Sequence, residues 1–338
     1  MSLKEYEVDD ERIDEWLPWG GITAPHVVQQ KDGSFLSVIE YQPYISSNDK
    51  KIKYREYKNG WSIWSEKQHL TKDRQFFVVC WNPFYNIQHK VENALVPNVQ
   101  SGKELNYFSK EVENIAADIS KVTSCKILEY QDILDFLYFS LSFSGEQIPM
   151  PDIPLYLDAL LSQDLAISFL DNNITIGDNT VLVLSLTGCP DKTVINKFAN
   201  VFKTVPYRYV RRMLLFDKKN AAANLKKYTT RWCSNRETLK EMILSDILSD
   251  LNGYYSEAFF ILLDSKLYDE AVHYCQNIIN DMGISCIIES YNLKDIWWGS
   301  IPGVFRANIT PPLTGFPYLD DFLSVAEPSA KAEPVKDK

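Results

Sequence analysis

The spacing of apolar residues predicts that strands and helices alternate in the first half of the chain. Residues 26–41 alternate on both sides of Asp32-Gly33, which is the pattern of a β-hairpin. Between residues 103 and 121 the apolar side chains recur every three or four positions, which predicts an amphipathic helix. The other elements expected here are a hairpin around residues 59–60, a strand at 75–81, a strand at 127–130 and a helix at 132–142.

The second half predicts a regular succession of elements. Three prolines between residues 149 and 154 interrupt regular structure and indicate a boundary. A βαβ unit, a helical insertion and a second βαβ unit follow, an order typical of a split βαβ or ferredoxin-like sandwich. The expected elements are a helix at 155–161, strands at 165–170, 174–176 and 181–186, a helix at about 191–205, a strand at 207–216, helices at about 218–250, a strand at 258–263, a helix at 266–282 and a strand at 284–289.

These patterns predict an α+β protein with antiparallel or mixed sheets and packed helices. At 338 residues the chain is long enough for two domains. We expect an N-terminal α+β subdomain at 1–148 and a ferredoxin-like subdomain at 149–325, with the helical insertion at about 218–250. The Pro-, Ala- and Lys-rich stretch 326–338 predicts a disordered tail.

Composition restricts the setting in which the chain works. The net charge of −10 argues against a protein whose main ligand is nucleic acid. No apolar run approaches the roughly 20 residues that cross a bilayer, and the N-terminus lacks the features of a signal peptide. The six cysteines have no paired spacing, which suits a reducing cytoplasm.

Residues 187–193 resemble a phosphate-binding loop at first sight. They follow an apolar strand, precede a predicted helix and end in Lys192-Thr193. A P-loop, however, has four residues between two glycines, and here Gly188 stands alone. Pro190 removes a backbone donor and Asp191 would repel a phosphate. We therefore interpret Asp191 as a helix N-cap and expect no nucleotide site in this chain.

Three arginines form the strongest basic cluster: Arg208, Arg211 and Arg212. Strand alternation places 208 and 212 on one face and 211 on the other. The cluster could dock an acidic partner or sense a neighbouring ATPase. The alternative is salt bridging to nearby acids on the sheet surface, and we favour it because exposed charges are usually solvated.

The stretch from Trp297 to Gly303 is the most informative part of the sequence. Two adjacent tryptophans, Trp297 and Trp298, need burial, so the end of this apolar segment must pack against other elements. In the Gly-Ser-Ile-Pro-Gly turn that follows, Pro302 fixes its own φ and Gly303 can adopt a positive one. We take Trp297, Trp298, Gly299, Pro302, Gly303 and Asn308, together with the three arginines, as candidate interface or structural residues.

Catalytic and metal-binding patterns are missing from the sequence. His273 and Cys275 lie two positions apart on a predicted helix and so point to different sides, which is unsuitable for a shared metal. No Ser–His–Asp or Cys–His arrangement can be assembled from the order of residues alone. An enzyme with an active site made of scattered residues stays open as an alternative.

The order of several motifs resembles the N-terminal region of the TrbE-like conjugal-transfer ATPases, within the CagE/TrbE/VirB group of type IV secretion systems. The resemblance runs from about residue 14 to residue 323. The matching motifs are Trp16 to Gly21, Ala24-Pro25, Lys31 to Phe35, the helix at 134–141, residues 151–160, Gly188-Cys189-Pro190 with Thr193, Pro206-Tyr207-Arg208, Arg211-Arg212, Arg231-Trp232, and Trp298 to Gly303 with Asn308.

The resemblance implies a role in docking rather than in catalysis. Members of this family continue into a RecA-like motor with Walker A and B motifs, and we expect this chain to be an excised, truncated or split product without that motor. It would bind inner-membrane subunits of the secretion channel, other copies of itself and a separately encoded motor, at the cytoplasmic face of the bacterial inner membrane. ATP and magnesium would belong to the motor of full-length relatives, so we expect no cofactor in this chain. A DNA-binding accessory protein that uses the cluster at 208–212 is a further alternative.

Overall fold

A computed structural model describes residues 13–42, 60–70, 72–83, 102–150, 156–163, 165–186, 206–215, 253–263, 286–290 and 293–304. Several predicted elements lie outside these residues: the first strand of the hairpin around 59–60, the helices at 191–205, 218–250 and 266–282, and the tail at 326–338. The elements, contacts and absences given below are those of the described ranges.

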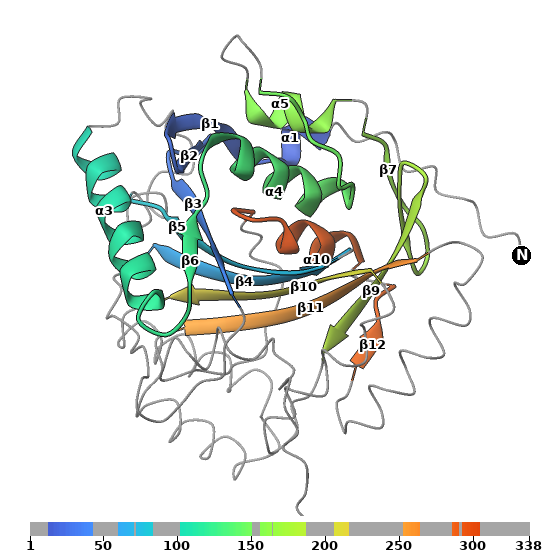
Figure 1. The fold of residues 1–338 in the computed structure, drawn as a ribbon. Coiled ribbons are helices and arrows are strands. Elements are labelled where there is room, and N and C mark those ends of the chain that lie inside the picture. Colours follow the sequence, from blue (N-terminus) through green and yellow to red (C-terminus); the bar gives the residue numbers. More distant parts are fainter. Residues whose placement is uncertain are drawn as a thin grey trace, which may run out of the picture.

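One twelve-stranded sheet organises the described fold (Figure 1). Ten strands follow each other in the order β1-β2-β3-β5-β4-β10-β11-β9-β8-β7, while β12 pairs with β9 and β6 pairs with β3. The strands are β1 (Trp19–Ala24), β2 (Val27–Gln30), β3 (Phe35–Tyr41), β4 (Trp61–His69), β5 (Asp73–Trp81), β6 (Cys125–Ile127), β7 (Ile167–Phe169), β8 (Ile174–Ile176), β9 (Asn179–Leu186), β10 (Tyr207–Leu215), β11 (Gly253–Leu263) and β12 (Cys286–Ile288).

Helices pack on both faces of this sheet. In Figure 1, α4 and α10 lie above the central strands, α5 and α1 lie above α4, and α3 lies at the side. The described helices are α1 (Ile13–Trp16), α3 (Gly102–Ile119), α4 (Tyr130–Ser142), α5 (Leu157–Ser162) and α10 (Leu293–Ser300). Antiparallel strands covered by a few helices confirm the predicted α+β class.

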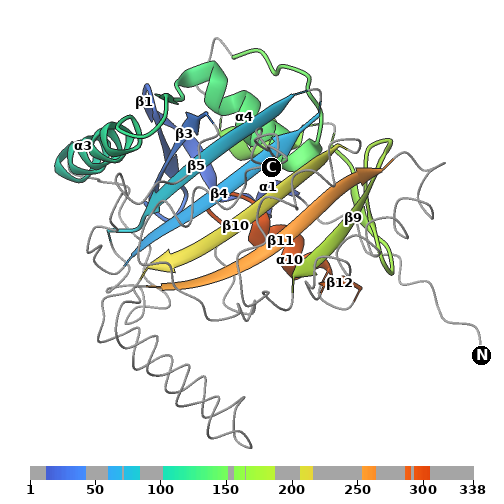
Figure 2. The ribbon, with the colours of Figure 1, turned by 60° about the horizontal axis from the view of Figure 1, so that its bottom comes forward.

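The two predicted subdomains contribute strands to the same sheet. Strand β4 from the first half pairs with β10 from the second, from Tyr207↔His69 to Leu214↔Ser62. Figure 2 shows β5, β4, β10, β11 and β9 side by side across this join. The division of the chain between residues 148 and 149 stays a prediction. A boundary there would separate β4 from β10, which pair in one continuous ladder of hydrogen bonds.

The strand order in the second half is that of a split βαβ unit. Strands β9 and β10 both run antiparallel to β11, which lies between them, so they are parallel to each other. Strands β11 and β12 both run antiparallel to β9, which lies between them, so they are also parallel to each other. The predicted crossover helices lie outside the described residues, so the ferredoxin-like assignment stays a prediction.

Alternation along the strands separates two apolar cores. Leu36 and Val38 of β3 face the core under α4, α5 and α10, whereas Phe35 and Ile39 face the core under α3. The predicted apolar face of α3 is confirmed, with Phe108, Val112, Ile115 and Ile119 buried. Strands β3, β4 and β5 therefore contribute side chains to an apolar core on each face of the sheet.

The first boundary of α4 differs from the sequence prediction. The strand expected at 127–130 is β6, which ends at Ile127, and the helix expected from residue 132 begins at Tyr130. The strand lies earlier because Cys125 and Ile127 pair with Tyr41 and Ile39 of β3. No described helix combines the length and the apolar character that crossing a membrane requires.

Candidate functional site

Helix α10 lies against the sheet and buries both tryptophans that the sequence singled out. Trp297 is 0% exposed and Trp298 is 2% exposed. The ring of Trp297 stacks on Phe143 after α4 at a centroid distance of 5.8 Å, and Trp298 lies 6.5 Å from Phe169 of β7. The expected burial is confirmed, and the two indoles fix this short helix between α4 and the β7 edge of the sheet.

The turn after α10 is fixed to the first strands of the chain. The indole Nε1 of Trp19 in β1 donates a hydrogen bond of 2.8 Å to the carbonyl of Pro302. Gly303 has φ +87, the positive value expected from the sequence. A Cβ on Gly303 would lie 1.8 Å from Nε2 of the buried Gln30, so only glycine fits this turn without rearrangement.

An ion pair between β10 and β4 lies below α10. Arg208 and Glu66 are each 0% exposed at their side chains, and Nε of Arg208 donates to Oε1 of Glu66 at 2.7 Å. A second bond joins Nη2 to Oε2 at 2.9 Å, so the pair is bidentate. The carboxylate also accepts hydrogen bonds from Gln68 Nε2 at 2.8 Å and from Ser140 Oγ of α4 at 3.2 Å.

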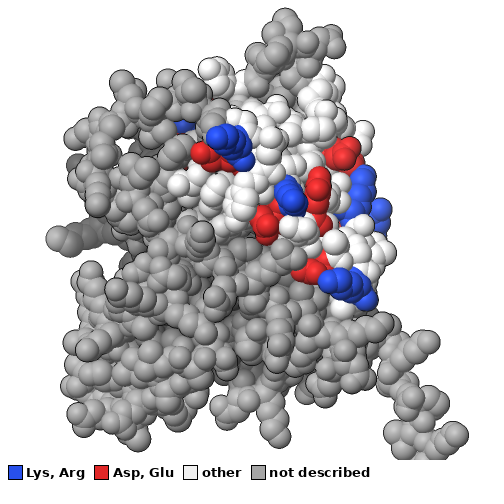
Figure 3. All heavy atoms as spheres, turned by 90° about the vertical axis from the view of Figure 1, so that its left-hand side faces the viewer, with Lys and Arg blue, Asp and Glu red and all other residues white. Residues whose placement is uncertain are grey.

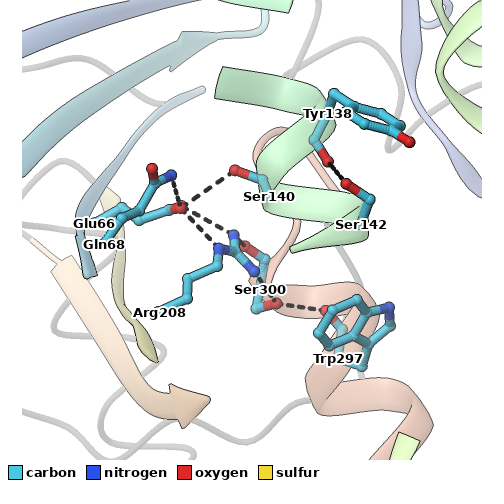
Figure 4. A network of polar contacts seen from close by, with 8 residues as sticks. All are labelled: Glu66, Gln68, Tyr138, Ser140, Ser142, Arg208, Trp297 and Ser300. Atoms are coloured by element: carbon cyan, nitrogen blue, oxygen red, sulfur yellow. Dashed lines mark hydrogen bonds and ion pairs between the residues drawn. The ribbon is translucent and has the colours of Figure 1, made fainter. Parts of the chain in front are cut away.

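The same guanidinium holds the end of α10 (Figure 4). Arg208 Nη2 donates to the backbone carbonyl of Ser300 at 2.9 Å, and Nη1 donates to its hydroxyl at 3.1 Å. Ser300 Oγ in turn donates to the carbonyl of Trp297 at 2.6 Å. A positive charge at this end of a helix interacts favourably with the helix dipole. Arg208 therefore connects β10 with β4 and α10, and Glu66 adds α4 through Ser140.

This geometry corrects the surface interpretation of the arginine cluster. The salt bridge expected at Arg208 exists, but it is buried inside the fold rather than exposed on the sheet surface. Arg208 in this position contacts no external partner, because its donors are directed at Glu66 and Ser300. The side chains of Arg211 and Arg212 lie outside the described part of the structure, as does Asn308.

Sequence reasoning missed the residues that complete this network. Glu66 lies in the polar run Ser65-Glu66-Lys67-Gln68, which has nothing to distinguish it from an exposed strand. Its partner in the ion pair lies 142 positions later. Trp19 was noted only as part of the family resemblance, and its bond to Pro302 spans 283 positions. Pairings this distant leave no local signal.

The network performs a structural task in the described fold. The carboxylate of Glu66 accepts four hydrogen bonds from protein donors, and its side chain is 0% exposed, so it contacts protein groups on the inside of the fold. Within the described ranges, no group of three or more His, Cys, Asp or Glu side chains could hold a metal ion. The loop at 187–193 lies outside those ranges.

Comparison with known proteins places the chain near conjugal transfer proteins. No family model matches it. Over 265 residues it is 23% identical to "Conjugal transfer protein TrbE" of Rhizobium radiobacter, which covers 69% of this chain and 32% of that protein. Over 228 residues it is 22% identical to the second part of a probable conjugal transfer protein TrbE of Sinorhizobium fredii (strain NBRC 101917 / NGR234). This match covers 59% of this chain and 33% of that protein.

These matches confirm the similarity to TrbE-like proteins that the sequence motifs predicted. The chain spans about a third of the length of the curated relatives it matches.

Proposed function

We propose that this chain is a component of a conjugal transfer system of the type IV secretion class. In this proposal it serves as the docking and assembly region of the transfer ATPase, and it anchors the motor to inner-membrane subunits of the channel. The observation that carries the proposal is the similarity to two proteins named TrbE, which covers 69% of this chain for one and 59% for the other.

The described fold supports a scaffold role. Its fully buried ion pair connects β4, β10, α4 and α10, elements that lie far apart in the sequence. Such a network fixes the relative positions of these elements, as a rigid adaptor requires. Arg208 and Glu66 are thereby committed to internal contacts.

We further propose that ATP and magnesium act in the motor of longer relatives, and that this chain itself hydrolyses no nucleotide. Its place would be the cytoplasmic face of the bacterial inner membrane, where it would contact the channel subunits, the motor and other copies of itself. These partners and this location follow from the proposed role.

A binding experiment tests the docking role. The purified chain, immobilised in its folded form, is incubated with the detergent-solubilised inner-membrane subunits of the conjugal transfer system from the same bacterium. We expect retention of at least one subunit at micromolar concentration, and no retention by a heat-unfolded sample. A folded chain that retains none of them would contradict the proposal.

The same preparation tests the two alternatives. Arg208 is interior, so the DNA-binding alternative loses one of its three arginines. DNA binding that weakens steeply with salt and is lost on Arg211→Ala would support it. Magnesium-dependent ATP turnover, abolished by a substitution within this chain, would support an enzyme.

A further inference from the structure

Tyr130 begins helix α4 in a backbone conformation that bulky residues rarely adopt. Its φ is +37, and its side chain remains 49% exposed. The fold holds this conformation through neighbouring backbone bonds, since the Tyr130 N–H donates to the carbonyl of Pro25 at 2.9 Å. A positive φ is rarely adopted outside glycine, and residues held in such conformations collect at binding sites. The backbone thus presents an aromatic ring to solvent.

A second exposed apolar side chain lies at the same end of α4. The amide of Gln131 donates to the carbonyl of Ile148 at 2.6 Å, and its Oε1 accepts the N–H of Met150 at 3.2 Å. These bonds hold residues 148–150 against the beginning of the helix. Met150 is 39% exposed and Pro149 is exposed beside it. We call Tyr130, Pro149 and Met150 the Tyr130 patch.

The surroundings of the Tyr130 patch are acidic. Residues 127–150 contain no lysine, arginine or histidine, and their acidic residues are Glu129, Asp132, Asp135 and Glu146. On the side of the molecule that carries α3 and β6, charges of both signs are mixed (Figure 3). The base next to this segment in the sequence, Lys126, is paired with Asp132, and His26 follows Pro25, whose carbonyl accepts the Tyr130 N–H. A hydrogen bond to Asp132, with Glu40 and Glu129 adding to it, raises the pKa of this lysine.

We infer that the Tyr130 patch docks a positively charged polypeptide segment that supplies an apolar anchor residue. Exposed Tyr and Met side chains on a segment whose own charges are all acidic form the kind of surface that buries such an anchor and orients a basic partner. A second copy of this chain, with its net charge of −10, fits this acidic surface poorly. Anionic lipid and nucleic acid are repelled for the same reason. The inference rests on the proposed docking function and names its surface and the chemistry of its partner.

The test uses the full chain and peptides of known sequence. Synthetic peptides of about 20 residues, spanning the cytoplasmic segments of the inner-membrane subunits, are titrated with the chain while fluorescence anisotropy is recorded. We expect basic peptides to bind and acidic ones not to bind. Raising the salt concentration should weaken binding, because exposed charges are screened.

Three substitutions separate the Tyr130 patch from other exposed aromatic surface. Tyr130→Asn removes the ring but keeps a residue that tolerates a positive φ, so we expect at least about tenfold weaker binding with stability unchanged or raised. Met150→Gln should weaken binding in the same direction. Tyr107→Gln is the matched control, because Tyr107 on α3 is 48% exposed and lies on the helix with mixed charges. It should leave binding unchanged.

The acidic rim is tested by a double substitution. Glu129 and Glu146 are both exposed, so Glu129→Lys together with Glu146→Lys changes the charge without disturbing the core. We expect weaker binding of basic peptides and a smaller effect of salt on what remains. Circular dichroism and thermal unfolding confirm that each variant is folded.

The outcomes distinguish this inference from the function on which it rests. If the membrane subunits bind the wild type and the Tyr130→Asn variant equally, the docking role stands and the Tyr130 patch is not its surface. If acidic and basic peptides bind alike, the stated chemistry is wrong. If no subunit and no peptide binds the folded wild type, the proposed function fails and the inference fails with it.

Discussion

A buried arginine is stable only when its donors find acceptors, and Arg208 meets this condition through two residues. The side chain is 0% exposed, and its bonds go to Glu66 and to Ser300. Removing two charges from water carries a penalty of several kcal/mol per ion, which mutual attraction offsets only when the geometry is good. The contribution of the pair to stability is therefore modest, while the loss of one partner is severe.

Substitution of either partner should destabilise the fold strongly. We expect Arg208→Met and Glu66→Leu each to lower the free energy of unfolding by about 3–5 kcal/mol, because each leaves a charge buried without its partner. The double variant should lose less than the sum of the two single losses. Urea unfolding monitored by tryptophan fluorescence measures all three values. Additive losses would contradict a direct coupling between the two side chains.

Cys80 should be unreactive in the folded chain. It lies in β5 and is 2% exposed, and burial, followed by the charge of Asp32, raises the pKa of its thiol well above the ordinary 9.0. Alkylation requires the thiolate, so reaction with iodoacetamide should be at least about tenfold slower than in urea. Mass spectrometry of the Cys80 peptide measures the rate. The partly exposed Cys125 provides the comparison within the same sample.

The raised pKa of Cys80 also gives the stability a pH dependence. The folded state retains the thiol proton that the unfolded chain releases, so the contribution is complete below pH 9.0 and declines as the pH rises above it. Burial and the charge of Asp73 raise the pKa of Tyr207, which acts in the same direction. The alkaline decline should be shallower in Cys80→Ala. If the slope of the free energy of unfolding against pH is unchanged in Cys80→Ala, groups other than Cys80 dominate the alkaline decline.

At the scale of elements, sequence patterns predicted structure wherever the signal was local. Strand β3 follows from alternation, β5 from a compact apolar run and helix α3 from helical spacing, each within its own residues. The buried tryptophans of α10 and the positive φ of Gly303 follow from residue chemistry in the same way.

The pairing of distant elements could not be predicted from such patterns. Nothing in β4 indicates that it adjoins β10 rather than an edge, and nothing near Glu66 indicates burial. The sequence alone favours a surface position for the arginine cluster for the same reason, because an exposed strand and a buried strand can have the same pattern of polar residues. The ion pair depends on the register of the sheet, which places Arg208 opposite Gln68 and diagonally across from Glu66.

The turn after α10 should tolerate no side chain at its second glycine. Gly303→Ala combines a positive φ with a Cβ that meets Gln30, so we expect a loss of about 1–3 kcal/mol in the free energy of unfolding. Gly21→Ala in β1 is the control, because a Cβ there meets nothing within 4 Å. Adding Gln30→Ala to Gly303→Ala should not restore stability fully, since the backbone strain remains. Urea midpoints compare the variants.

For the whole molecule, the single sheet has a consequence for unfolding. Two independent domains divided near residue 149 would unfold in separate steps, whereas a ladder shared by β4 and β10 couples the two halves. We expect one urea transition, with tryptophan fluorescence and far-UV circular dichroism giving the same midpoint. We also expect residues 1–148 expressed alone to be unfolded or aggregated, because β4 would become a long unpaired edge. Two resolved transitions would support the predicted division instead.

The contacts of Arg208 also bear on how the protein matures during synthesis. Glu66 leaves the ribosome 142 residues before its arginine, and Ser300 follows 92 residues after that. Until the ribosome has released Arg208, the nascent chain cannot bury Glu66 without trapping an unneutralised carboxylate, and until it has released Ser300 two donated bonds of the guanidinium lack their acceptors. Translation therefore has to pass the end of α10 before this network can form completely.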